Sequence, residues 1–120
     1  MTALLVALGA ALGAPLRYLT DRAVQARFGT GFPWGTLTVN VLGSLLLGAV
    51  TGLPADPALT ALVGTGFCGA LTTWSTLSYE TLRLARAGRR HAALANMALS
   101  VAAGLAAATA GYALARAATG

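Results

Sequence analysis

The residues of this chain that could do chemistry gather in one stretch, GFCGALTTWSTLSYE, from Gly66 to Glu80. Its second half is rich in hydrogen-bond donors, which are hydroxyl groups and one indole N–H: Thr73, Trp74, Ser75, Thr76 and Ser78. A small, strongly hydrated anion must recover its lost water contacts from close donors of this kind. The electropositive edge of the Trp74 ring can also face an anion. These residue types therefore indicate binding of a small anion.

The first half of the same stretch predicts a break in a helix. Gly66 and Gly69 weaken a helix, and the β-branched Thr72 and Thr73 do not restore it. Inside a membrane segment, such a run is typical of a helix that breaks midway and lines a polar cavity. Carbonyl groups freed near Gly69 and Thr72 could hold a small cation such as Na⁺. The residues alone leave both ions open, a small anion or Na⁺.

Other polar residues lie within or beside apolar stretches. Asn40 is expected to face the interior of a helix bundle, because a buried amide costs free energy unless it is hydrogen-bonded. It either lines a pathway or only bonds one helix to another. Asn96 and Ser100 stand one turn apart and form a polar stripe with the same two alternatives. Arg17, near a membrane end, either snorkels as an anchor or supplies positive potential at the mouth of an anion route.

Composition indicates an integral membrane protein of one domain. Of the 120 residues, 57% are hydrophobic and 9% are charged, and the mean hydropathy is +0.72. A soluble domain carries about 25% charged residues. The net charge of +5 does not indicate a nucleic-acid partner, because no basic face with interleaved aromatic residues is present. An enzyme is not expected: His91 lies in a predicted loop, Cys68 has no nearby base, and no pair of carboxylates exists.

The hydropathy pattern predicts an all-α membrane protein with four transmembrane helices, at about residues 4–19, 35–53, 59–83 and 92–114. Residues 1–120 then form a single four-helix transmembrane domain, with the third helix broken in mid-membrane. Loops are expected around Asp21 to Arg27 and from Arg86 to His91.

Glycines spaced four residues apart predict close helix contacts. Gly9 pairs with Gly13, and Gly48 pairs with Gly52. Such pairs let helix backbones approach closely, either within one subunit or at a subunit interface. Four short helices barely enclose a pathway alone, so a dimer is expected.

The distribution of arginines predicts the orientation in the bilayer. Arg116 falls on the side of the N-terminus, whereas six arginines fall on the other side: Arg22, Arg27, Arg83, Arg86, Arg89 and Arg90. The positive-inside rule then places both termini outside and the two arginine-rich loops in the cytoplasm. We expect a multi-pass protein of the cell membrane.

Three motifs together resemble one known family. GAALGAPLRY, from Gly9 to Tyr18, is similar to that family's GGxxGAxxRY, with Ala10 replacing the second glycine. GTLTVNVLGSLLLG, from residue 35 to residue 48, is similar to GTLxVNxxGSFxxG, and GFCGALTTWSTLSYE to GFxGgxTTFSTFSxE. In this order and with four spans, the motifs resemble the fluoride-specific ion channels of the Fluc (CrcB) family over most of the chain.

The resemblance implies a fold and a function. It implies a dual-pore channel made of two antiparallel subunits, which exports F⁻ passively from the cytoplasm and so relieves fluoride toxicity. It implies a structural central Na⁺, bound but not transported, held by the backbone carbonyls of Gly69 and Thr72 from each subunit. It places residues of this sequence at a fluoride pathway and its vestibule: Asn40 on the route, Ser75 and Thr76 flanking it, Trp74 and Leu77 where the family has two pore phenylalanines, and Arg17 near the vestibule.

Two departures from the family pattern bear on the subunit arrangement. Leu77 has no ring quadrupole, so one of two aromatic contacts with the anion is missing, whereas Trp74 keeps an aromatic edge and adds a donor. A homodimer of two orientations needs nearly balanced loop charges, and this chain is strongly biased. The alternatives are an antiparallel homodimer and a heterodimer with a homologue of opposite topology.

Two other functions compete with the channel. A small multidrug-type exporter is also a four-helix dimer, but proton-coupled export needs a carboxylate inside the membrane, and residues 1–20 contain none. A structural membrane subunit would explain the glycines. It would not explain a hydroxyl-rich break beside an intramembrane Asn40.

Overall fold

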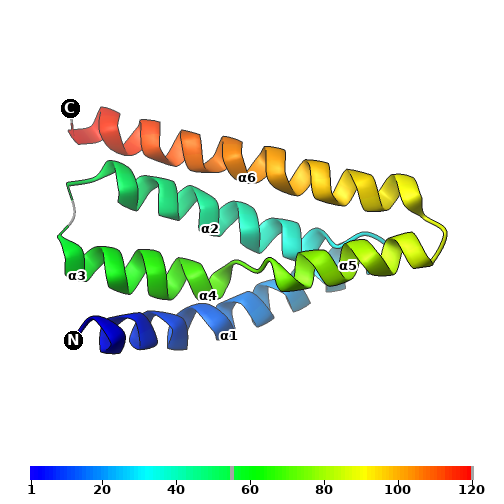
Figure 1. Cartoon of the computed structure of the whole chain (residues 1–120), viewed down its shortest axis with the longest axis horizontal. Coiled ribbons are helices and arrows are strands. Elements are labelled where there is room, and N and C mark those ends of the chain that lie inside the picture. The colour runs from blue at the N-terminus through cyan, green and yellow to red at the C-terminus, as the bar shows by residue number, and fades with distance from the viewer. Residues whose placement is uncertain (55, 120) are drawn as a thin grey trace.

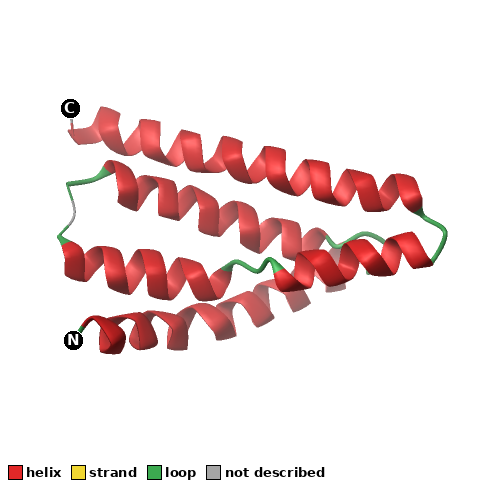
Figure 2. Cartoon of the chain, in the orientation of Figure 1, coloured by secondary structure: helices red, strands yellow, loops and turns green. Residues whose placement is uncertain are grey.

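Three long helices lie side by side along the long axis of the molecule (Figure 1). They are α1 (Thr2–Phe28), α2 (Trp34–Gly52) and α6 (Arg90–Thr119). The structure is a computed structural model that describes residues 1–54 and 56–119, and its described residues form helices and loops without strands (Figure 2). Each of the three is long and apolar enough to cross a membrane. The expectation of an all-α protein is confirmed.

The segment expected to form the third crossing is divided into several shorter helical pieces. They are α3 (Pro57–Leu59), the π-helical η1 (Thr60–Cys68), α4 (Gly69–Leu71) and α5 (Ser75–Arg86). The Asp56 carboxylate starts the series by accepting a hydrogen bond from the Leu59 N–H at 2.9 Å. Three residues, Thr72 to Trp74, lie outside the helices. The described residues therefore contain three long candidate crossings, and the expected third crossing is not a single helix.

Helix α1 is longer than the sequence pattern predicts. It continues through Pro15 and ends at Phe28. The prediction of a loop around Asp21 to Arg27 is therefore wrong. Side-chain pairs one turn apart support its polar end: Gln25 Nε2 donates to Asp21 Oδ2 at 2.9 Å, and Arg22 Nη1 donates to Tyr18 Oη at 3.1 Å. Hydropathy detects the apolar part of a helix and misses such a polar extension.

Glycines bring α2 and α6 into backbone contact. A Cβ atom added at Gly48 would lie 2.1 Å from the Ala108 carbonyl oxygen, and one at Gly111 would lie 2.1 Å from the Leu45 carbonyl oxygen. At Gly52 the added atom would lie 2.7 Å from the carbonyl oxygen of Tyr112. No side chain fits at these contacts, so the Gly48 and Gly52 pair packs within the chain.

The pair Gly9 and Gly13 likewise packs α1 against η1 and α4. A Cβ at Gly9 would lie 2.0 Å from the Leu62 carbonyl oxygen, and one at Gly13 would lie 2.4 Å from that of Phe67. These contacts hold the segment before the interruption against α1. They leave its other side free to face α2 and α6.

The chain has two distinct ends (Figure 1). Both termini lie at one end of the bundle, and the α1–α2 and α5–α6 connections lie at the other. A guanidinium N–H of Arg89 donates to the carbonyl oxygen of Gly31 and joins these two connections. The arginines near the ends of α1 and α5 and at the start of α6 therefore lie at this same end of the bundle.

Candidate functional site

The interruption between α4 and α5 is held by the side-chain amide of Asn40 on α2. Asn40 Nδ2 donates to the Thr73 carbonyl oxygen at 3.0 Å, and the Thr73 N–H donates to Asn40 Oδ1 at 2.7 Å. One side chain thus satisfies both backbone groups of a residue outside any helix. We call this pair the Asn40–Thr73 clasp.

The side chain of Thr73 starts the next helix. Its Oγ1 accepts a hydrogen bond from the Thr76 N–H at 3.1 Å, the geometry of a residue that caps a helix N-terminus. Its hydroxyl also lies 3.5 Å from Ser75 Oγ. Thr72 turns its hydroxyl back to the Cys68 carbonyl oxygen at 2.9 Å. The hydroxyl hydrogen of Thr72 is therefore used within the chain.

These bonds have a consequence for the backbone carbonyls. In a continuous helix the Thr73 N–H would donate to the Gly69 carbonyl, and the Thr76 N–H would donate to the Thr72 carbonyl. The first N–H is instead bonded to Asn40, and the second to the Thr73 hydroxyl. The carbonyl oxygens of Gly69 and Thr72 therefore lose their helical donors. These are the two carbonyl groups that the sequence predicts as ligands of a small cation.

A cavity of about 680 Å³ lies beside the interruption, between α2, the η1–α4 segment and α6. Its polar lining includes both carbonyl-bearing residues and Ser100, whose buried hydroxyl oxygen has no hydrogen-bond partner among the described residues. Gly69 is exposed on this side, and a Cβ added to it would meet nothing within 4 Å. Predicted site residues that line this cavity are Asn40, Gly69, Thr72, Trp74, Leu77 and Ser100.

A second cavity, of about 200 Å³, lies toward α1. Arg17 and Thr76, both predicted site residues, line it together with Tyr18, Asp21, Thr36, Val39 and Thr73. Thr73 is the residue common to the linings of both cavities. The interruption therefore separates the cavity that contains Arg17 from the larger one.

Two predicted site residues line neither cavity. Ser75 is exposed at the start of α5. Asn96 is 1% exposed and donates from Nδ2 to Thr81 Oγ1 at 3.0 Å, which bonds α6 to α5. Its Oδ1 atom has no partner among the described residues. The bond to Thr81 fits the alternative in which Asn96 holds helices together.

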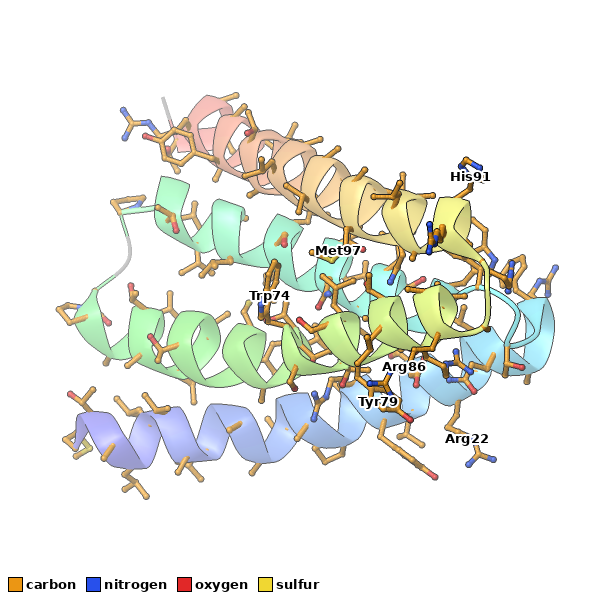
Figure 3. All side chains as sticks on the ribbon, turned by 45° about the vertical axis from the view of Figure 1, so that its right-hand side comes forward. Arg22, Trp74, Tyr79, Arg86, His91 and Met97 are labelled. Atoms are coloured by element: carbon orange, nitrogen blue, oxygen red, sulfur yellow. The ribbon has the colours of Figure 1, made fainter. Side chains whose placement is uncertain are left out.

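The two residues at the pore-phenylalanine positions differ in exposure. The Trp74 side chain is 64% exposed at the larger cavity, where Figure 3 shows it beside the interruption. Leu77 is 2% exposed and packs into the core of the chain. An incoming ion would thus meet the Trp74 ring far more readily than Leu77.

Sequence reasoning missed one polar contact near the site. Thr36 Oγ1 donates to Glu80 Oε1 at 2.5 Å and links α2 to α5. The available signal was periodicity, since Thr36 stands one turn before Asn40 and Glu80 one turn after Thr76. Polar residues thus follow one face of each helix toward the interruption.

Apolar helices long enough to cross a membrane, with an interrupted segment beside two cavities, define a multi-pass membrane protein. This chain belongs to the CrcB-like family, because residues 4–112 match the family described as "CrcB-like protein, Camphor Resistance (CrcB)". The family is one of ion channels and not of enzymes.

Relatives match nearly the full length of the chain. A protein of Frankia casuarinae named "Fluoride-specific ion channel FluC 1" is 62% identical, with 100% of both chains covered. Proteins with the same name from Streptomyces avermitilis and Thermobifida fusca are 58% and 55% identical. The alignments cover 92% and 94% of this chain, and 93% and 94% of those proteins. The family resemblance is confirmed.

Proposed function

We propose that this protein is a fluoride-selective ion channel of the cell membrane, which exports F⁻ passively from the cytoplasm and relieves fluoride toxicity. The observation that carries the proposal is the Asn40–Thr73 clasp, which keeps a short non-helical segment beside two cavities. The names of the full-length relatives support the choice of ion.

The proposed pathway follows the donors around the interruption. F⁻ loses water on entry and regains contacts from hydroxyl and N–H groups. Asn40 uses one N–H of its amide in the clasp, which leaves the other free, and the buried Ser100 hydroxyl has no partner among the described residues. From the cavity linings we assign Trp74, Thr76 and Leu77 to the route, with Arg17 at the vestibule. Ser75 and Asn96, which line neither cavity, are assigned to it from the sequence.

A structural Na⁺ fits the donor set at the interruption. Na⁺ is a hard cation that prefers oxygen ligands, and the carbonyls of Gly69 and Thr72 have lost their helical donors. The described residues contain no group of three or more His, Cys, Asp or Glu side chains that could hold a metal. One chain offers two such carbonyls, and a second copy would offer two more. Bound there, the ion would supply fixed positive charge between two subunits, without being transported.

The proposed assembly is an antiparallel dimer with the interruption in mid-membrane. Gly69 is exposed and has open space around it, as a residue at a subunit contact would need in the separate chain. The arginine bias favours a single orientation for this chain, which supports pairing with a homologue of opposite topology. The homodimer is the alternative arrangement.

The test is ion efflux from liposomes that hold the purified chain, in Na⁺ buffer, followed with fluoride and chloride electrodes. Fluoride loss with chloride retained is the expected result, either for this chain alone or after co-expression with a homologue of opposite topology. The first outcome identifies a working homodimer, and the second a heterodimer. Fluoride retention in both preparations would refute the channel.

Two further readouts separate the competing functions. A proton-coupled exporter would move a cationic drug against its gradient when a pH gradient is applied, whereas the channel should be indifferent to it. A structural subunit would pass no ion in either preparation.

A further inference from the structure

Positive charge is concentrated at the end of the bundle opposite the termini. Five exposed arginines gather where α1 and α5 finish and α6 begins, and we call them the arginine cluster: Arg22, Arg27, Arg86, Arg89 and Arg90. Figure 3 shows Arg22, Arg86 and His91 at this end. Arg83 is not included, because it stands one helical turn from Glu80.

The carboxylates of the chain do not balance this charge. The chain has three acidic residues, Asp21, Asp56 and Glu80. Asp21 accepts from the Gln25 amide at 2.9 Å, and Glu80 accepts from the Thr36 hydroxyl at 2.5 Å. Asp56 lies at the other end of the bundle and caps α3. The hydrogen bonds of all three carboxylates, within the described part of the chain, therefore go to neutral groups.

The contacts of the arginines themselves are also with neutral groups. Arg22 donates to the Tyr18 hydroxyl at 3.1 Å, and its guanidinium carbon lies 5.8 Å from the centre of that ring. The Arg27 guanidinium lies 6.0 Å from the Phe28 ring centre. Arg89 donates to the Gly31 carbonyl. These contacts orient guanidinium groups but supply no negative charge.

Helix dipoles divide the cluster into two kinds of site. Arg27 and Arg86 lie in the last turns of α1 and α5, where the partial negative charge of the helix end favours a cation. Arg89 and Arg90 lie at the start of α6, where the partial charge is positive, and the first turn of that helix holds no acidic residue. An anion from outside the chain would relieve this repulsion.

The cluster also adjoins exposed apolar and aromatic side chains. Phe28 at the end of α1, and Tyr79 and Leu82 on α5, are 63%, 66% and 51% exposed. A free phosphate ion would gain nothing from them, whereas a phospholipid can place its headgroup on the guanidinium groups and its acyl chains along these residues. We propose that the arginine cluster binds the headgroups of anionic phospholipids. This inference does not depend on which ion the protein conducts.

Lipid titration of the purified, full-length protein in detergent micelles tests the proposal. Phosphatidylglycerol and phosphatidylcholine are added separately, and lipid retention is counted by native mass spectrometry while the thermal midpoint is followed. Phosphatidylglycerol should be retained more tightly and should raise the midpoint more than phosphatidylcholine does. The difference should shrink as salt is raised, because exposed charges are screened. Equal retention of the two lipids would overturn the proposal.

Variants locate the binding site. The triple variant Arg22→Gln, Arg86→Gln, Arg90→Gln removes charge while leaving the Arg89 contact between the two connections intact. It should weaken phosphatidylglycerol binding by about 100-fold, at about fivefold for each arginine. Arg116→Gln, an exposed arginine at the opposite end, is the matched control and should leave binding unchanged. Undiminished binding by the triple variant would contradict the assignment.

Two additional measurements keep the test decisive. If the triple variant does not fold, the single variants Arg86→Gln and Arg90→Gln carry the comparison, each with a loss of about fivefold. sn-Glycerol 1-phosphate, which carries the phosphate without acyl chains, should give no rise in the midpoint at the same concentration. A rise equal to that from phosphatidylglycerol would show that free phosphate, and not lipid, is the ligand.

Discussion

Asn40 and Thr73 exchange two hydrogen bonds, of 3.0 and 2.7 Å, although their positions in the sequence differ by 33. An amide side chain here replaces the helical partners that the Thr73 backbone does not have. In an apolar surrounding, both backbone groups would otherwise be left without partners. The clasp is therefore the contact on which the shape of the interruption depends.

Replacing Asn40 by leucine should destabilise the fold and stop fluoride efflux. The substitution leaves the N–H and carbonyl of Thr73 unpaired, at a cost of about 2 to 4 kcal/mol in the free energy of unfolding. Thr38→Val is the matched control, because the Thr38 hydroxyl, among the described residues, bonds only to the Trp34 carbonyl of its own helix. That control should stay within about 0.5 kcal/mol of the wild type in chemical denaturation. Equal stability of both variants would mean that the clasp does not stabilise the fold.

Thr73→Val should loosen the start of α5. It removes the Oγ1 atom that accepts from the Thr76 N–H, and the loss of such a cap costs about 1 kcal/mol. Amide hydrogen exchange at Thr76 should then quicken by about fivefold, whereas Thr73→Ser, which keeps the oxygen, should exchange like the wild type. Unchanged exchange in the valine variant would assign the start of the helix to other contacts.

Ser100→Ala should separate conduction from stability. The Ser100 hydroxyl is buried without a partner among the described residues, so its removal should leave the thermal midpoint unchanged or slightly raised. If the hydroxyl serves the fluoride route, efflux should fall by about tenfold, the equivalent of one hydrogen bond to an ion. If the variant releases fluoride at the wild-type rate, Ser100 is not part of the route.

Gly48→Ala should disrupt the packing of α2 against α6. The new methyl group would lie 2.1 Å from the Ala108 carbonyl oxygen, so the two backbones must separate, and overpacking of this kind costs about 1 to 3 kcal/mol. Gly104→Ala is the control, since its nearest neighbour would be Ser44 Oγ at 3.6 Å. Thermal unfolding of the two variants side by side checks the difference. A midpoint for Gly104→Ala as low as that for Gly48→Ala would contradict it.

Gly69→Ala should leave the single chain folded and weaken the proposed dimer. Open space surrounds the position in the chain, but a methyl group there would stand between the proposed subunits. The dimer fraction of the variant, measured by light scattering after size exclusion, should be lower than that of the wild type. Replacing Na⁺ by choline should lower the dimer fraction of the wild type and should not lower that of the variant any further. Gly31→Ala, at the far end of the bundle, controls for the substitution itself. If the dimer fraction of the wild type does not change when Na⁺ is replaced, the proposal of a structural Na⁺ is wrong.

Hydropathy and spacing predicted the helical fold because each apolar run had the length of a membrane crossing. They did not predict the end of α1, whose last turns depend on contacts such as that between Asp21 and Gln25. Asn40 was expected to face inward from the cost of burying an amide. Its partner Thr73 could not be predicted, because periodicity relates residues within one helix and not residues on two different segments.

The placement of both termini at one end of the bundle limits how two copies could be joined in a single polypeptide (Figure 1). In an antiparallel pair, the C-terminus of one copy and the N-terminus of the next would open on opposite faces of the membrane. A soluble linker of any length would force the copies parallel. A covalent tandem would need a connecting segment that itself crosses the bilayer an odd number of times, about 20 apolar residues for one helical crossing.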